Sequence, residues 1–269
     1  MTTLDALRTI SDLLSSQHIA EPQAKAKVIL GHVMGDTDIM ANVPEKSWHT
    51  MLRMANRAAL NEPVEYITGK SYFRYLELDV NASVLIPRHE TEQVVDTAIN
   101  IIRQNGYKTA LDMCTGSGCI AISLATETQV SVSATDISES AINLAKHNAQ
   151  ANSASVNFFV SDMFTDVSGT FDIIVSNPPY VSESDYDALD PGVKDFEPAL
   201  ALVSGDGQDH YRIIAQQAGS YLNNGGALVL EIGADQAQDV AELLRQSGFT
   251  NIELKQDYQD RDRIVTAYK

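Results

Sequence analysis

Apolar side chains recur every three or four residues along the N-terminal part of the chain. This spacing holds from residue 3 to residue 16 and again from residue 24 to residue 33, where Gly35 follows. A third segment of the same kind runs from about Ser47 to Leu60, and Glu62-Pro63 ends it. Because helical spacing places these side chains on one face, the pattern predicts short amphipathic helices that form a small bundle. Such a bundle either docks another molecule, covers a site, or only stabilises the rest of the chain.

The pattern changes to alternating apolar and polar residues over residues 71–86, with an interruption at Asn81-Ala82-Ser83. This alternation predicts a β-hairpin at the connection between two domains. We therefore expect a helical domain over residues 1–75 and a larger domain over residues 76–269.

Beyond residue 109, short apolar runs of strand length alternate with segments of helical spacing. Such alternation predicts an α/β fold, in which a mostly parallel sheet has helices on both faces. The strands are expected near residues 109–113, 130–135, 156–160, 171–176, 227–231, 252–255 and 264–268, and the helices near residues 119–125, 139–149, 208–222 and 234–247. The long irregular segment Val181–Asp206 is expected to face a substrate, because long loops inside a compact domain are usually functional.

The charge of the chain is uneven. The formal net charge is −17, and residues 1–75 hold eight Lys or Arg and eight Asp or Glu, so the excess lies in the larger domain. An acidic domain disfavours binding to a polyphosphate backbone, which depends on cationic contacts. The acidic surface either keeps the protein soluble or meets a partner of basic character.

The remaining composition excludes several classes of protein. Cys114 and Cys119 are too few and too close together for a disulfide framework, and no Cys/His cluster has the spacing of a metal site. The first residues lack the basic and apolar segments of an export signal, and no apolar run is long enough to span a membrane. We expect a monomeric, reduced, cytoplasmic protein without a metal, which binds neither membranes nor nucleic acid directly.

The segment Asn177-Pro178-Pro179-Tyr180 follows the apolar run Phe171–Ser176, so it is expected at the carboxyl end of a buried strand. Its residue types suit the alkylation of a planar amide or aromatic amine nitrogen, whose delocalised lone pair makes it a poor nucleophile. The Asn177 side-chain carbonyl and the Pro178 backbone carbonyl are each expected to accept one N–H of that group. Tyr180 offers a flat aromatic face to it. Alternatively, the segment is only a turn that ends a strand.

A glycine-containing loop, Cys114-Thr115-Gly116-Ser117-Gly118, joins the strand near residues 109–113 to the next helix. Glycines permit close approach of a ligand to the backbone, although this loop also satisfies a dinucleotide-binding fingerprint. Asp136 ends the next strand, where an acid holds the ribose hydroxyls of a nucleoside. Asp162-Met163-Phe164 ends the third strand and offers an acceptor and apolar cover for an adenine, or else Phe164 is a core residue.

Taken together, these segments resemble class I S-adenosylmethionine-dependent methyltransferases, and more narrowly the bacterial peptide chain release factor glutamine methyltransferases. The motifs that carry the resemblance are Glu62–Gly69, Leu85–Arg88, Glu90-Thr91-Glu92, the glycine-containing loop, Asp136, Asp162, Asn177–Tyr180 and Phe196–Leu200. The resemblance implies a Rossmann-like sheet of seven strands, the last of them antiparallel, preceded by a small helical domain. It also implies that S-adenosylmethionine is the cofactor and that the glutamine of a release factor's Gly-Gly-Gln loop enters between Asn177 and Tyr180.

Two positions depart from the family pattern, which usually has Gly at Cys114 and Pro at His89. Cys114 disfavours a positive φ and adds a side chain where the methionine part of the cofactor is expected. His89 loosens the start of a helix. Neither change removes a group that the chemistry needs.

Other functions remain as alternatives. An adenine-specific DNA methyltransferase uses the same Asn-Pro-Pro-Tyr chemistry but needs a basic face, and another protein glutamine methyltransferase fits the same motifs. A nicotinamide dehydrogenase explains the loop and Asp136 but leaves Asn177 without a role. A cofactor-binding scaffold without activity does not need the substrate acceptors.

Overall fold

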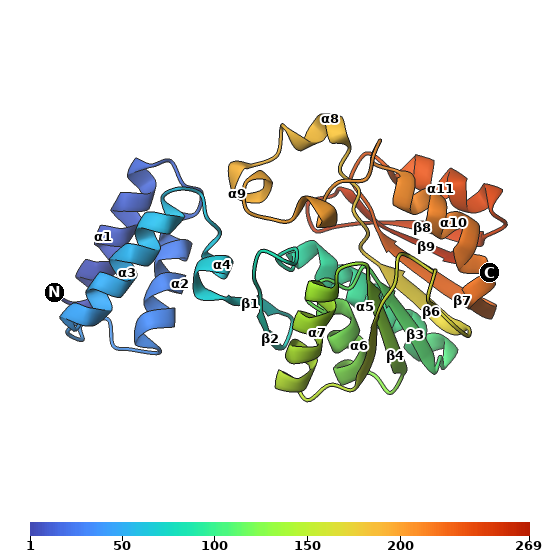
Figure 1. Ribbon diagram of the computed structural model, residues 1–269, viewed down its shortest axis with the longest axis horizontal. Helices are drawn as coiled ribbons and strands as arrows, with labels where there is room; N and C mark the ends of the chain where they lie inside the picture. Colours follow the sequence, from blue (N-terminus) through green and yellow to red (C-terminus); the bar gives the residue numbers. More distant parts are fainter. The chain divides into compact units, whose positions relative to one another are not determined.

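A computed structural model describes residues 1–269, and the chain divides into two compact units. The first unit comprises residues 1–70 and 190–196, and the second comprises residues 71–189 and 197–269. Figure 1 shows the helices of residues 1–70 in blue to teal and the central sheet of the second unit in green to red. None of the helices has the length and apolar character needed to cross a membrane.

The first unit is a bundle of short helices, as the periodicity predicts. Its helices are α1 (Thr3–Ser16), α2 (Pro22–Met34), α3 (Glu45–Ala58) and α4 (Val64–Thr68). Thr2 and Asp5 form a capping box that satisfies free N–H groups at the start of α1. The apolar faces meet in one core around Ile10, Ile29 and Met51, all fully buried. The amphipathic spacing is therefore sufficient to define this unit's core.

A two-stranded sheet follows, although the predicted hairpin is partly wrong. Its strands are β1 (Lys70–Phe73) and β2 (Leu76–Asp79), so the turn lies at Arg74-Tyr75 rather than at residues 81–83. Arg74 tolerates a positive φ of 53° there because its guanidinium pairs with Glu127 and Asp96. Residues 84–86 form no strand. Instead, the Ile86 N–H donates to the Glu197 carboxylate.

The second unit contains the predicted sheet of seven strands. In chain order they are β3 (Thr109–Met113), β4 (Ser131–Asp136), β5 (Val156–Val160), β6 (Phe171–Ser176), β7 (Leu222–Glu231), β8 (Thr250–Gln256) and β9 (Asp262–Tyr268). Their spatial order is β5-β4-β3-β6-β7-β9-β8. Strands β3 to β7 pair in parallel, and β9 runs antiparallel to both β7 and β8. The expected Rossmann-like fold with an antiparallel last strand is confirmed.

Helices cover both faces of this sheet because alternate residues of each strand point to opposite sides (Figure 1). Ala110, Ile173 and Val229 pack under helices α5 (His89–Asn105), α6 (Cys119–Glu127) and α7 (Glu139–Ala151). Leu111, Ile174 and Leu228 pack on the other face under α10 (Asp209–Tyr221) and α11 (Ala237–Gln246).

The segment after β6 is less irregular than its sequence indicates. It contains the single-turn helices α8 (Glu183–Tyr186) and α9 (Pro191–Lys194) and a short 3₁₀ helix, η1 (Ala199–Ala201). An isolated bridge between Val181 and Val203 joins the two ends of this segment.

Candidate active site

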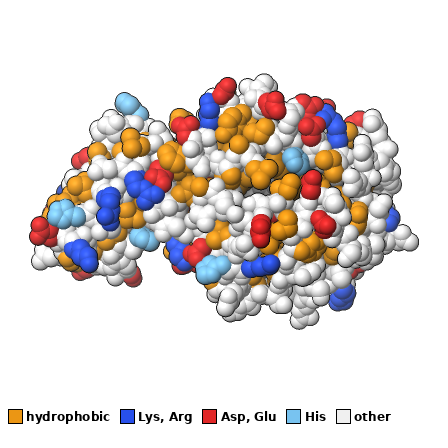
Figure 2. Space-filling view, viewed as in Figure 1, with side chains coloured by type: hydrophobic (Ala, Val, Ile, Leu, Met, Phe, Trp, Pro, Cys, Tyr) orange, Lys and Arg blue, Asp and Glu red, His pale blue; other side chains and the backbone are white.

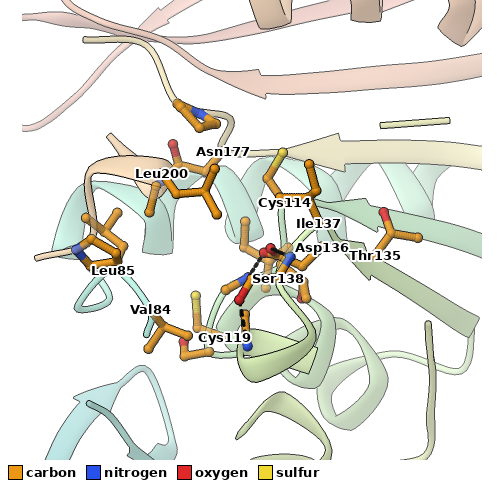
Figure 3. A pocket seen from close by; sticks show the side chains of 18 of the residues that line it. Val84, Leu85, Cys114, Cys119, Thr135, Asp136, Ile137, Ser138, Asn177 and Leu200 are labelled. Carbon is orange, nitrogen blue, oxygen red and sulfur yellow. Dashed lines mark hydrogen bonds between the residues drawn. The ribbon is translucent and has the colours of Figure 1, made fainter. Parts of the chain in front are cut away.

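A pocket lies at the carboxyl ends of strands β3, β4 and β6 in the second unit (Figure 3). The chain builds the sheet from β3 outward to β5 and then returns to place β6 on the other side of β3. Loops after β3 and β6 therefore leave in opposite directions, and such a switch point leaves a crevice for a ligand. Cys114 follows β3 and Asn177 follows β6, and both line the pocket.

The loop after β3 has a backbone that L-residues rarely adopt. Gly116 and Gly118 have φ values of 54° and 86°, and Cys114 itself has φ of 58°. A Cβ on Gly118 would lie 3.0 Å from the Ile122 side chain and 3.1 Å from Ala145, so close packing of α6 and α7 also requires glycine there. Cys114 carries a left-handed strain of about 1 kcal/mol that glycine would avoid. Cys114 was expected to disfavour a positive φ, and the fold nevertheless imposes one on it, at the cost of this strain.

Asp136 is held rigidly at the end of β4. Its Oδ2 accepts the N–H of Gly116 at 2.9 Å, and its Oδ1 accepts the N–H of Ser138 at 2.9 Å (Figure 3). Burial raises the pKa of this carboxyl, and the two N–H groups act in the opposite direction. The side chain lines the pocket, so its remaining lone pairs are available to a ligand.

A second acid, Asp112, lies beneath the loop and is fully buried. Its Oδ2 accepts the Thr115 hydroxyl at 2.6 Å and the Ala121 N–H at 3.1 Å, whereas Oδ1 has no partner. Burial raises the pKa of Asp112 to about 7. Thr115 therefore lines the pocket while its hydroxyl is committed to the carboxylate below.

The other cofactor residues predicted from the sequence divide into two groups. Ser117, Asp162 and Met163 line the pocket, whereas Gly118 lies outside its lining and caps α6. Phe164 is buried and stacks on Tyr221 with ring centroids 4.7 Å apart, so the alternative that places it in the core is correct.

The Asn-Pro-Pro-Tyr segment contributes unequally to the pocket. Asn177 and Pro179 line it, whereas Pro178 and Tyr180 do not. The Tyr180 side chain packs partly against the core, and burial raises its pKa to about 12. The Gln236 amide donates to the Tyr180 carbonyl at 3.0 Å and fixes the chain there. The aromatic face expected from Tyr180 is therefore not part of this pocket wall.

The sequence assigned no role to Thr91 and His210, which line the pocket, or to Glu231, which lies outside its lining. Thr91 comes from the first turn of α5, and His210 comes from α10, where its Nδ1 lies 2.7 Å from the Ser204 hydroxyl. Glu231 ends β7 behind Thr91 and is 1% exposed. The sequence contains one signal for Glu231. It is an acid at the end of the apolar run 227–231, and the strand ends of a parallel sheet meet at one edge.

Comparison with known proteins agrees with this architecture. The model of the "Methyltransferase small domain" matches residues 73–193, and that of the "PrmC N-terminal domain" matches residues 5–69. The chain is similar to the release factor glutamine methyltransferase of Chlorobaculum tepidum, with 37% identity over 99% of this chain and 97% of that protein. The corresponding protein of Thermodesulfovibrio yellowstonii is 35% identical over 100% of this chain and 99% of its own.

A solved methyltransferase from Pyrococcus furiosus is similar in fold, with a TM-score of 0.56 and 17% identity over 84% of this chain and 99% of that one. At that identity the likeness concerns the fold alone. The sequence relatives extend over the whole chain, including the helical unit. The chain therefore belongs to the release factor glutamine methyltransferase family.

Proposed function

We propose that this protein transfers a methyl group from S-adenosylmethionine to the side-chain amide nitrogen of the glutamine in the Gly-Gly-Gln motif of peptide chain release factors. One observation carries the proposal. Asn177, with its planar amide, lines the same pocket as the glycine-containing loop and Asp136. The family to which the chain belongs supports this reaction and this class of substrate.

The pocket suits the proposed cofactor in shape and charge. Apolar side chains such as Ile120, Ile137 and Leu200 line it, and Asp136 lines it too, with lone pairs to spare. Figure 3 shows Asp136 beside Ile137. Apolar walls match an adenine ring, and an acid at a strand end matches ribose hydroxyls. Asp136 and Asp162 also line the pocket, and the one lining arginine, Arg88, is paired with Glu197, so the excess of negative charge favours a cation. When bound there, S-adenosylmethionine supplies an activated methyl group on its sulfonium.

The chain's own residues position the substrate. Asn177 accepts one N–H of the glutamine amide, and the Pro178 carbonyl accepts the other, so the nitrogen lone pair is aimed into the pocket. Pro179 lines the pocket and fixes the backbone that follows Asn177. No strong base is required, because the nitrogen loses its proton after the new bond has formed. Positioning therefore supplies most of the rate enhancement.

The acidic second unit favours a protein substrate over a nucleic acid. Net negative charge works against the phosphate contacts that an adenine-specific DNA methyltransferase needs. We expect the protein to act as a monomer in the cytoplasm, where its substrate is synthesised.

The Asn177→Ala variant tests this function directly. We expect turnover on a purified release factor to fall by about a hundredfold or more, the scale at which positioning fails. Asn177→Asp keeps an acceptor but adds a charge near the sulfonium, so its turnover is expected to be intermediate. Cofactor affinity, measured by calorimetry on the same preparations, changes little in either variant. Parent-like turnover in the alanine variant would make Asn177 a turn residue only.

We also propose that the helical unit docks the release factor. Lys46, His49 and Arg53 are exposed along one side of α3, and they line a shallow depression there. Lys and Arg side chains are visible on this unit in Figure 2. The two cations Lys46 and Arg53 outnumber Glu45, the acid that lines the same depression, so they suit an acidic surface on the substrate protein and act chiefly on the rate of association.

Charge reversal tests the docking role in the full-length chain. The double variant Lys46→Glu/Arg53→Glu is expected to raise the KM for the release factor by about tenfold at low salt, with kcat unchanged. Lys25→Glu/Lys27→Glu, on α2, makes the same change of net charge, is the matched control and leaves the KM unchanged. An unchanged KM in the double variant would show that this side of α3 does not dock the substrate.

A further inference from the structure

Three polar side chains from distant segments form a connected series behind the pocket. Asn177 follows β6, Thr91 lies in the first turn of α5, and Glu231 ends β7. The Asn177 Nδ2 lies 3.4 Å from the Thr91 Oγ1, and the Thr91 hydroxyl donates to the Glu231 Oε2 at 2.6 Å. Thr91 and Glu231 are only 2% and 1% exposed. Nothing in the proposed binding of cofactor or substrate accounts for this buried series.

The proton on Thr91 determines how Asn177 is oriented. A threonine hydroxyl has one proton, and an ionised carboxylate can only accept. The Thr91 proton is therefore committed to Glu231, and the Thr91 oxygen can only accept from Asn177. The amide of Asn177 must then present its NH2 group to Thr91, which leaves its Oδ1 free on the other side. Hydrogen-bond chemistry alone therefore fixes the orientation of the amide.

We propose that Thr91 and Glu231 are positioning residues that hold Asn177 with its amide oxygen, rather than its amide nitrogen, toward the substrate. The inference rests on the proposed function, in which that oxygen accepts an N–H of the glutamine amide. The 3.4 Å separation is long for a hydrogen bond, but such contacts tighten when a substrate is bound. The wrong orientation of Asn177 would place an NH2 group against the NH2 group of the substrate.

Protonation of Glu231 removes the constraint on the series. A neutral carboxyl can donate to Thr91, which frees the Thr91 proton to point at Asn177, so the opposite amide orientation becomes accessible. Burial raises the pKa of Glu231 to about 7, while the Thr91 hydrogen bond and Arg263 oppose that shift. The other charged groups that face it are Glu90, which raises the pKa, and Arg88, which lowers it. Tyr211 donates to the main-chain oxygen of Glu231 rather than to its carboxylate.

The effect of Glu231 protonation on turnover has a definite sign. Because the active orientation needs the ionised carboxylate, turnover falls as the pH is lowered through the pKa of Glu231 and is retained above it. Glu231→Gln removes the titrating group, so the part of the pH profile that depends on it disappears.

Steady-state kinetics with matched variants test the positioning role. Thr91→Val removes the hydroxyl at almost constant volume, and we expect kcat on a release factor to fall by about tenfold or more with cofactor affinity unchanged. Thr91→Ser restores the hydroxyl and returns kcat to within about twofold of the parent. Thr97→Val, on the same helix, removes a hydroxyl that donates to the Gln93 carbonyl and accepts from Lys255, and it serves as the control.

A double-mutant comparison separates positioning from general stability. In the Asn177→Ala background, Thr91→Val is expected to lower kcat no further, because the residue that it orients is gone. A further loss of the same size in that background, or an equal loss in Thr97→Val, would overturn the proposal. Parent-like kcat in Thr91→Val would overturn it as well.

A second measurement does not depend on methyl transfer. The side-chain NH2 resonances of Asn177, assigned by their absence in Asn177→Ala, should shift as the pH passes through about 7 in the parent. We expect this shift to disappear in Thr91→Val and in Glu231→Gln. If the parent fails to methylate a release factor, the proposed function is wrong. The resonances would still show whether Thr91 and Glu231 orient the Asn177 amide. Resonances that do not titrate in the parent would refute it.

Discussion

Replacing Asp136 by alanine should weaken binding of S-adenosylmethionine by about ten- to a hundredfold. The carboxylate is already oriented by the N–H groups of Gly116 and Ser138, both at 2.9 Å, so it loses little freedom when it accepts two ribose hydroxyls. Two charge-assisted hydrogen bonds contribute about 1.5 kcal/mol each, and about 3 kcal/mol corresponds to a factor of about 150. Water that replaces the missing carboxylate recovers part of this loss, which sets the lower end of the range.

The assay is titration calorimetry of the cofactor with the parent and with Asp136→Ala. Asp166→Ala is the matched control, because Asp166 is an exposed acid on the neighbouring loop and lies outside the pocket lining. A melting curve checks that the variant is folded, since alanine leaves two N–H groups without their carboxylate partner. Equal affinity in Asp136→Ala and the parent would show that this pocket edge does not hold the ribose.

The same group predicts the direction of a pH effect. Burial raises the pKa of Asp136 above that of an ordinary aspartate, and only its ionised form accepts both hydroxyls. Affinity should therefore be constant above the raised pKa and fall as the pH drops through it. Asp112 titrates nearby as well, and the charge of Asp136 helps to raise its pKa, so Asp136→Ala removes the Asp136 step and also lowers the pKa of Asp112. Parallel pH profiles for the two proteins would contradict the reasoning.

The remaining predictions concern the backbone of the glycine-containing loop, and chemical denaturation measures both. Cys114→Gly relieves the left-handed strain at φ of 58°, so its free energy of unfolding should be equal to that of the parent or higher by about 1 kcal/mol. Cys114→Val should lower the free energy of unfolding by about 2 kcal/mol, because a β-branched residue tolerates this φ poorly. Equal stability of the two variants would contradict the strain. Gly118→Ala should destabilise the protein by about 1 to 3 kcal/mol, because the new Cβ would lie 3.1 Å from Ala145. A Cβ on Gly116 meets nothing within 4 Å, so Gly116→Ala should cost only the strain of its positive φ. A larger loss of stability in Gly116→Ala than in Gly118→Ala would refute this.

Local patterns were sufficient for most of the fold. Apolar runs of strand length predicted β3, β5 and β6 at their observed bounds. For the central strands β3 and β6 the reason is that a buried parallel strand is apolar on both faces, so the pattern needs no distant information. The pattern failed at residues 84–86, an apolar run that resembles a strand. A single side chain, Glu197, takes the place of a partner strand for Ile86, and no local pattern encodes that contact.

The sequence by itself determined which residue types stand at the ends of the strands, including Asn177 after β6 and Asp136 at the end of β4, because strand length and termination are local properties. Only the tertiary structure decided which strand ends are neighbours and where each side chain points. Thr91 is 86 residues from Asn177 and 140 residues from Glu231 along the chain, and the order of the sheet brings the three together. Tyr180, three residues from Asn177, lies outside the pocket lining because the core beside it accepts the aromatic ring. Packing over such separations is a property of the whole fold, so the periodicity of the chain cannot contain it.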